Sequence, residues 1–276
     1  MRSRNPWSWV RYPATALALF VILFPFYWLV VTSFKGPMDA AAYPPHLLPH
    51  PLTLVNYQRI FAVFHFERYF VNSTVVASAT TVAVAVLGSL AAYALARLPV
   101  RGKVSILLAL LVISLFPGVA VISPLYVLMR DISWLNSYQG LVVPYVAFNL
   151  PLAIWILQNY FRGIPRELEE SARMDGAGLL RTLRSIILPL SVPGLFTAGI
   201  FTFVACWTEF LMALTFNSSN NWRTIPVAIA LFGTRFSVSK GDVFAASALA
   251  VLPITILVLL FRRWVVSGLL SGAVKG

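Results

Sequence analysis

The sequence predicts an all-α, polytopic membrane protein with six transmembrane helices. Of its 276 residues, 59% are hydrophobic and only 11% are charged, and the mean hydropathy is +0.82. A soluble domain of this size carries about 25% charged residues. One transmembrane helix needs about 20 consecutive apolar residues to cross a hydrocarbon core about 30 Å thick. The chain contains several such runs, separated by short polar segments.

Six apolar segments are long enough to span the bilayer, and together they predict a single transmembrane domain over residues 1–276. The first run, about 22 residues long, is too long for a cleaved secretory signal, so we expect an uncleaved span. Pro117-Gly118 and Pro193-Gly194 predict kinked helices whose freed backbone groups are satisfied by neighbouring helices. The predicted spans are 13–34, 70–96, 104–128, 138–161, 187–214 and 243–261.

The basic residues predict that both termini lie in the cytoplasm. With the N-terminus inside, fourteen of the 21 lysines and arginines fall in inner segments. The inner linker 97–103 has three in seven residues, whereas the outer loop 35–69 has three in thirty-five. Cytoplasmic loops of membrane proteins carry this excess of Lys and Arg. The net charge of +12 is thereby divided among short loops, which argues against nucleic-acid binding.

The sequence contains no motif typical of an enzyme active site. It has no phosphate-binding G-x-x-x-x-G-K-[ST] loop, no H-E-x-x-H and no G-x-S-x-G. His46 and His50 could pair around a metal, but Pro49 interrupts a helix between them, so the favoured interpretation is surface histidines and no metal site. The only cysteine, Cys206, lies within a predicted span, so no disulfide is expected.

Three functional classes remain open for such a chain: a pore driven by other subunits, an ion-coupled carrier, and a membrane structural or assembly protein. Ion-coupled carriers place several ionisable groups inside the membrane. The six predicted spans contain one, Glu209, near the outer end of the fifth. The sequence therefore indicates a passageway without a driving mechanism of its own.

The inner loop 162–186 is the most charged part of the chain, and it predicts two short helices joined by a break. Three glutamates follow Pro165, where a helix N-terminus favours negative charge. Asp175-Gly176 then ends the first helix. The second helix has apolar residues at three-to-four spacing, with Arg181 and Arg184 between them. The loop can either rest on lipid headgroups or dock in a cleft of a cytoplasmic partner.

This loop resembles the E-A-A-x-x-x-G-(x9)-I-x-L-P signature of permease subunits of binding-protein-dependent ABC importers. Ser171 replaces the first alanine of the signature. Similarity to the carbohydrate-uptake branch extends over most of the chain, including Ser33-Phe34-Lys35 and Ala92-Tyr93-Ala94. Within that branch the chain resembles the shorter, six-span permease of maltose/trehalose-type and glycerol-phosphate-type systems. The matching residues of the signature are Glu170, Ala172, Gly176, Ile186, Leu188 and Pro189.

The resemblance implies an ABC type I importer permease fold in a bacterial or archaeal cytoplasmic membrane. It also implies a second permease subunit that completes the pore, two ATP-binding cassette subunits that hold Mg-ATP, and an extracytoplasmic solute-binding protein. This chain would then be a transport subunit with no cofactor of its own. The solute would be a sugar such as maltose or trehalose, or alternatively a non-sugar such as glycerol phosphate.

The resemblance also implies where the ATPase subunits bind. The first helix of the inner loop would lie in a groove of the ATPase, so that closure of the ATPase moves the spans. The tail 268–276 would also reach the ATPase pair. The residues expected to form the dock are Glu170, Arg173, Asp175, Gly176 and Leu179.

The substrate pathway is less constrained by the sequence. Trp207-Thr208-Glu209-Phe210 resembles the family's W-N-[DE]-F, with Thr208 where Asn is usual. Glu209 either contacts sugar or makes a structural pairing near the outer boundary, and Asn149 is a second candidate pore residue. The outer loop 215–242 is either a solvated cap or a segment that faces the solute-binding protein. Its candidate residues for the second role are Trp222, Arg223 and Phe232.

Overall fold

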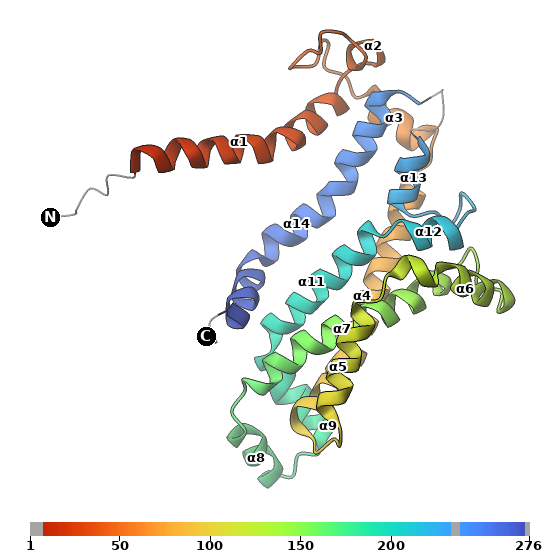
Figure 1. Ribbon diagram of the computed structural model, residues 1–276. Coiled ribbons are helices and arrows are strands. Elements are labelled where there is room, and N and C mark those ends of the chain that lie inside the picture. The colour runs from red at the N-terminus through yellow and green to blue at the C-terminus, as the bar shows by residue number, and fades with distance from the viewer. Residues whose placement is uncertain (1–7, 233–237, 274–276) are drawn as a thin grey trace. The chain divides into compact units, whose positions relative to one another are not determined.

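The computed structural model describes residues 8–232 and 238–273, and the side chains of residues 11–232 and 238–261. Every secondary-structure element in these ranges is a helix, which confirms the predicted all-α class. Figure 1 shows the helices and their labels. In chain order they are α1 (Ser8–Ser33), α2 (Pro37–Ala40), α3 (Val55–Ala62), α4 (Phe66–Arg97), α5 (Lys103–Ser114), α6 (Gly118–Asp131), α7 (Gln139–Arg162), α8 (Glu167–Met174), α9 (Leu179–Thr182), the π-helix η1 (Leu183–Ile187), α10 (Leu188–Leu190), α11 (Val192–Thr208), α12 (Leu211–Phe216), α13 (Ile225–Phe232) and α14 (Lys240–Ala273).

Four of these helices are each long and apolar enough to cross a membrane. They correspond to the first, second, fourth and sixth predicted spans. Two bent helix pairs pass the same test when each pair is taken together, which gives up to six spans in the described residues. The four long segments are Arg11–Ser33, Phe66–Arg97, Gln139–Arg162 and Lys240–Phe261.

The third predicted span, 104–128, is broken in the structure. α5 and α6 meet at an angle of 89° across residues 115–117. Pro117 is extended, with φ −66° and ψ 114°, and it precedes the first residue of α6. A proline has no backbone N–H to donate and disfavours helical geometry in the residue before it. The Pro117-Gly118 kink that the sequence predicts is therefore a complete break.

The fifth predicted span, 187–214, is divided at two points. The helical stretch Leu179–Leu190 meets α11 at 82°, with Ser191 at the bend. α11 then ends at Thr208, and α12 begins at Leu211 after an extended Glu209. Pro193 lies in the first turn of α11, where a missing N–H costs no helical hydrogen bond.

The chain forms two compact units: residues 1–67 with 229–252, and residues 68–228 with 253–276. In the first unit, the buried Asn56 donates from Nδ2 to the carbonyl oxygens of Ser33 (2.9 Å) and Lys35 (2.7 Å). Arg59 Nη2 lies 3.4 Å from the carboxylate of Asp242. These contacts fix α3 against the end of α1 and the start of α14.

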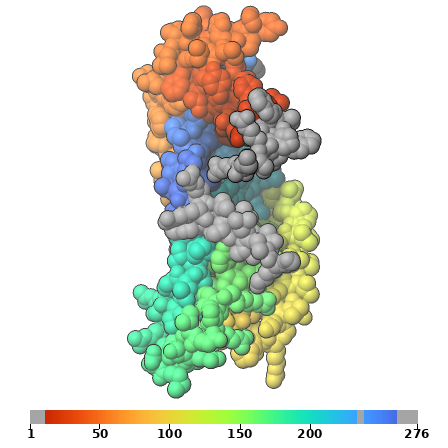
Figure 2. Space-filling model, turned by 90° about the vertical axis from the view of Figure 1, so that its left-hand side faces the viewer, coloured from red at the N-terminus to blue at the C-terminus, as the bar shows by residue number. Residues whose placement is uncertain are grey.

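The second unit has α7 at the centre of its apolar core. α7 packs against α11 and α5, and its buried residues join those of α4 and η1. The segment 162–190 lies at one end of this unit, where α4 ends and α5 begins (Figures 1 and 2). The buried residues of the core are Val84, Ala92, Tyr93, Leu95, Ala96, Ala153, Ile154, Leu157, Phe161, Leu183, Ile187 and Ala198.

The contact between α7 and α11 depends on a glycine. A Cβ added at Gly194 would lie 2.5 Å from Cγ of Tyr160, far inside van der Waals contact. Small residues at helix interfaces in membranes allow this close approach of backbones. At Gly199, further along α11, a Cβ would meet only Thr81 at an ordinary 3.6 Å.

We predict that Gly194→Ala lowers the melting temperature of the purified protein. Overpacking a close contact of this kind costs about 1–3 kcal/mol. Gly199→Ala on the same helix is the matched control and should melt close to the parent, because its added methyl group has room. Equal melting temperatures for the two variants would contradict the close packing of α7 and α11.

Candidate functional site

The inner loop has the local structure that its sequence predicts. α8 carries Glu167, Glu169 and Glu170 in its first turn and Arg173 in its last, matching the helix dipole at both ends. The helix ends at Met174. Gly176 follows with φ +80°, a left-handed conformation that glycine adopts at least cost. The loop therefore reverses direction at this glycine.

All five residues proposed as the dock are exposed on this loop, which is 162–186. Three large apolar side chains lie among them without cover from the chain: Met174 is 88% exposed, Leu180 69% and Leu179 50%. A surface that combines exposed apolar residues with charges of both signs is typical of a protein contact site. The dock residues are Glu170, Arg173, Asp175, Gly176 and Leu179.

The opposite side of the loop is fastened to the helical core by an ion pair that the sequence analysis missed. Arg97 Nε, on the last residue of α4, lies 2.8 Å from Oε1 of Glu169, and both side chains are about 95% buried. Arg97 Nη2 also donates to the carbonyl oxygens of Phe161 and Ile164, each at 2.5 Å. One guanidinium therefore joins α4, the end of α7 and the start of α8.

The remaining contact of Glu169 comes from Tyr93, whose hydroxyl donates to Oε2 at 3.3 Å. Tyr93 and Arg97 are four residues apart and so lie on the same face of α4. The motif A-Y-A-x-x-R at 92–97 holds both residues, so its spacing was the available signal for this junction. No pattern in the sequence indicated which of three neighbouring glutamates they bind.

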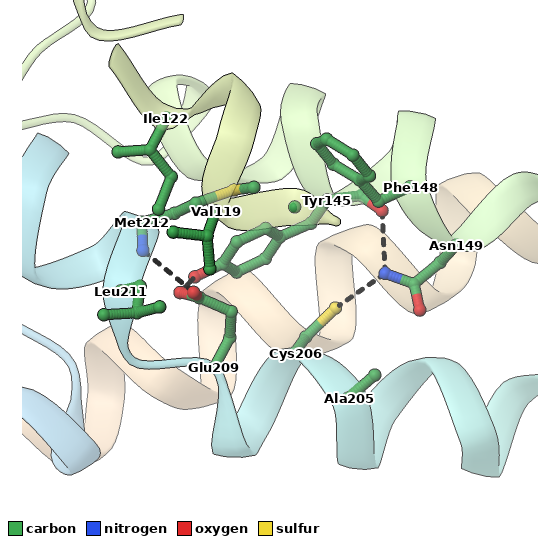
Figure 3. A pocket seen from close by; sticks show the side chains of 11 residues that line it. Val119, Ile122, Tyr145, Phe148, Asn149, Ala205, Cys206, Glu209, Leu211 and Met212 are labelled. Carbon is green, nitrogen blue, oxygen red and sulfur yellow. Dashed lines mark hydrogen bonds between the residues drawn. The ribbon is translucent and has the colours of Figure 1, made fainter. Parts of the chain in front are cut away.

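A cavity of about 340 Å³ lies in the second unit between the broken third span, α7 and the end of α11. Figure 3 shows its side chains. It brings together Glu209 and Asn149, two of the three residues proposed for the substrate pathway. It is lined by Gly118, Val119, Ile122, Tyr145, Phe148, Asn149, Ala205, Cys206, Glu209, Leu211 and Met212.

The carboxylate of Glu209 is held by structural hydrogen bonds. It accepts from the backbone N–H groups of Met212 (2.8 Å) and Ala213 (3.0 Å), which caps the start of α12. It also accepts from the Tyr145 hydroxyl of α7 (Figure 3). Of the two alternatives for Glu209, these contacts support a structural pairing.

Asn149 and Trp207 differ in their access to this cavity. Asn149 lines it and donates from Nδ2 to the Tyr145 carbonyl oxygen at 2.8 Å. Trp207 is buried, with its ring stacked on Phe203 and in edge contact with Phe70. The structure therefore brings Asn149 to the cavity but places Trp207 in the packing of α11 against α4.

The segment 217–224 of the outer loop contacts the start of α4 and Tyr138, the residue before α7. Asn72 Nδ2 donates to the carbonyl oxygens of Asn221 and Arg223, each at 2.9 Å, and Trp222 packs edge-on against Tyr138. Trp222 and Arg223 remain half-buried at the surface.

Phe232, the third candidate of the outer loop, lies in the first unit. It is 3% exposed and packs on Phe64. Its ring therefore presents almost no surface to a partner. Residues 233–237 of the same loop lie outside the described residues.

The family model of the binding-protein-dependent transport system inner membrane component matches residues 84–271, about two-thirds of the chain. The chain belongs to this family. This match confirms the resemblance seen in the loop 162–186. It identifies the chain as a permease subunit of an ABC importer, a transport component that is not itself the catalyst.

Among curated relatives, the chain is 41% identical over 263 residues to a trehalose/maltose transport system permease protein of Thermococcus litoralis, covering 94% of each chain. It is 40% identical over 256 residues to a trehalose transport system permease protein of Mycobacterium tuberculosis, covering 92% of this chain and 93% of the relative. Its fold is similar to a chain in the crystal structure of a bacterial ABC transporter that imports the acidic polysaccharide alginate. The TM-score is 0.83 at 20% identity, over 95% of this chain and 98% of the other.

Family membership has consequences for partners and location. A binding-protein-dependent permease works with an ATPase and a solute-binding protein, and the several apolar helices make this one a multi-pass membrane protein. The chain, including its loop 162–186, is therefore one subunit of a larger transporter.

We predict that Glu169→Ala detaches α8 from the core. Removing one partner of a buried ion pair costs about 3–5 kcal/mol, because the other charge stays buried without compensation. Trypsin should then cleave after Arg166 and Arg173 faster than in the parent. Glu167→Ala, an exposed glutamate in the same first turn, is the control and should leave the cleavage rate unchanged. Equal protection in both variants would contradict an anchoring role for Glu169.

Proposed function

We propose that this chain is one of two pore-forming permeases of an ATP-driven sugar importer, with an oligosaccharide such as trehalose or maltose as its solute. The observation that carries the sugar assignment is the 41% identity to a trehalose/maltose permease over 94% of both chains. The alternative solute within the same transporter class is a glycerol phosphate.

The proposed assembly contains a second, different permease and two ATP-binding cassette subunits. An external solute-binding protein delivers the sugar. Both termini lie in the cytoplasm, and residues 1–276 act as one six-span permease domain in a cytoplasmic membrane. The excess of Lys and Arg in the inner loops supports this orientation. The tail 268–276 reaches toward the ATPase pair; its residues 274–276 lie outside the described residues.

The inner loop docks in a groove of the ATPase through its exposed side. Glu170, Arg173 and Asp175 pair with charges on the ATPase, and Leu179 fills part of the groove. The exposure of these side chains supports the dock. The buried Glu169–Arg97 pair supports transmission, because any displacement of α8 acts directly on α4 and α7.

The cavity beside Asn149 is the section of the sugar pathway that this chain contributes. Its aromatic and amide groups, from Tyr145, Phe148 and Asn149, are of the kind that bind sugar rings and hydroxyl groups. Glu209 shapes this cavity by holding α12, and Trp207 supports it through the packing of α11. On the outer side, Trp222 and Arg223 face the solute-binding protein, and Phe232, which is buried on Phe64, acts through packing of the first unit.

The direct test is uptake by the complete complex in liposomes. With its partner subunits, solute-binding protein and internal ATP, the complex should accumulate labelled trehalose or maltose. An ionophore that collapses ion gradients should leave the rate unchanged. Uptake that needs no ATP, or that stops with the ionophore, would contradict the proposal. Uptake of glycerol phosphate alone would overturn the sugar assignment while leaving the transporter class intact.

A second test examines whether the loop 162–186 couples the ATPase to transport. Gly176→Pro should abolish ATP-driven uptake, because proline fixes φ near about −65° where the chain needs +80°. The double reversal Glu170→Lys with Asp175→Lys should do the same by charge repulsion at the dock. The amount of assembled complex in the membrane should not change.

Gly178→Ala is the matched control for these loop variants. Gly178 has φ −73° and open space around it, so alanine fits without strain. This variant should transport at the parental rate. Normal uptake by Gly176→Pro and by the charge-reversed variant would refute the docking role.

A further inference from the structure

The external loop 36–54 buries the side chain of its one charged residue, Asp39, and exposes most of its large apolar side chains, together with His46 and His50. Its exposed side chains include Tyr43 at 96%, Met38 at 92%, Leu52 at 69% and Leu47 at 64%. A loop in water normally has the opposite arrangement. An apolar surface of this kind on an ordered segment marks contact with a membrane or another molecule.

Both full charges at the base of this loop, those of Lys35 and Asp39, are held by hydrogen bonds to loop residues. Lys35 is 1% exposed; its Nζ donates to the His46 carbonyl oxygen at 2.5 Å and lies 4.2 Å above the ring centre of Trp28. The Asp39 side chain is 6% exposed and binds His46 Nδ1 at 2.6 Å. The backbone N–H of His50 donates to its other oxygen at 2.8 Å. The surface of residues 36–54 therefore contains no exposed Lys, Arg, Asp or Glu.

The carboxyl group of Asp39 is stabilised in its ionised form. The hydrogen bond from the His50 backbone, followed by the one from His46, lowers the pKa of Asp39 below its usual value. The hydrogen bonds of the Asp39 carboxylate to His46 and His50 join the two ends of the segment 39–50. The loop is therefore a pre-formed surface.

A hydrogen bond to α1 fixes the depth of the loop. The Tyr27 hydroxyl donates to the carbonyl oxygen of Leu47 at 2.6 Å. Tyr27 lies six residues before the end of α1 at Ser33, which is about 9 Å along the helix axis. The apolar segment Arg11–Ser33 has 23 residues. Its length of about 34 Å barely exceeds a hydrocarbon core of about 30 Å. The Leu47 backbone is thus held beside a part of α1 that lies within the membrane.

The surface of the loop is continuous with the surface of α1 around this point. Phe24, Phe26 and Val30 of α1 are each 40–51% exposed, and none of the most apolar stretch of this helix is buried by the chain. Leu47, whose carbonyl oxygen binds Tyr27 of α1, and the neighbouring Leu48 are 64% and 61% exposed. Tyr27 and Trp28 are aromatic residues of the kind that concentrate at membrane interfaces.

From these contacts we propose that loop 36–54 is a membrane anchor. Leu47 and Leu48 insert into the lipid leaflet beside the outer end of α1, and Tyr43 lies at the headgroup level. The occupant of this apolar surface is lipid. The anchor, together with the Lys35–His46 and Asp39–His46 contacts, fixes the outer end of the first span relative to the bilayer.

The test uses the single cysteine of the chain. Cys206→Ala gives a background without thiols, in which Leu48→Cys accepts a nitroxide spin label. The complex with its partner subunits is reconstituted in liposomes, and the accessibility of the label to oxygen and to a water-soluble nickel chelate is measured by EPR power saturation. Leu17→Cys in the middle of α1 is the lipid reference, and Ser218→Cys in the polar loop 217–224 is the water reference.

We expect the label at position 48 to have the same relative accessibility to oxygen and nickel as the label at the lipid reference, position 17. The logarithm of the ratio of oxygen to nickel accessibility should be positive at positions 48 and 17 and negative at position 218. A negative value at position 48 would place the loop in water and overturn the proposal. Low accessibility to both reagents would place it against another protein chain and would overturn it equally.

Integrity of the labelled complex is checked by its assembly with the partner subunits. Should the Leu48→Cys chain fail to assemble, Tyr43→Cys supplies the same measurement, since the Tyr43 side chain is 96% exposed. At position 43 the label should lie at the level of the lipid headgroups. Its ratio of oxygen to nickel accessibility should therefore fall between the ratios at positions 17 and 218. A ratio equal to the water reference would overturn the proposal.

Discussion

The buried pair of Arg97 and Glu169 is the interaction on which the junction of α4, α7 and α8 depends. It gathers the end of α4, the end of α7 and the start of α8 around one guanidinium. Burying two charges is costly, and the cost is offset only when the remaining donors and acceptors are also satisfied. The carbonyl oxygens of Phe161 and Ile164 and the Tyr93 hydroxyl supply those partners. The exposed surface of the loop 162–186 is thereby joined to two long helices.

Two of the predicted spans are sharply bent in this structure. The third and fifth predicted spans turn by 89° and 82°, and the break after α11 is held by hydrogen bonds from Glu209. The cavity lies between these interrupted segments, whereas α4 and α7 are continuous. The continuous helix α7 also lines the cavity, through Tyr145, Phe148 and Asn149, so the cavity has one unbroken wall and two interrupted ones.

Sequence patterns predicted the helical class, the positions of the spans and the turn at Gly176, because each rests on local chemistry: apolar length, proline and glycine, and charge at helix ends. They did not predict the Arg97–Glu169 pair, since it joins residues 72 positions apart and nothing local distinguishes Glu169 from Glu167 or Glu170. Glu209 was left with two roles for the same reason: its partners Tyr145 and Met212 are defined only by the packing of α7 and α12. Predicted spans also ran through Pro117 and Ser191, where hydropathy continues but the backbone direction does not.

The first helix, α1, is stabilised differently from the helices of the core. The most apolar stretch of α1 buries none of its residues against the rest of the chain, and the last two turns of α1 make contacts through Tyr27, Trp28 and Ser33. Its hydrophobic free energy is therefore gained from the solvent that surrounds it rather than from folding of the polypeptide. Unfolding measured in detergent reports on the remaining helices, and the choice of detergent or lipid acts on α1 as a separate variable.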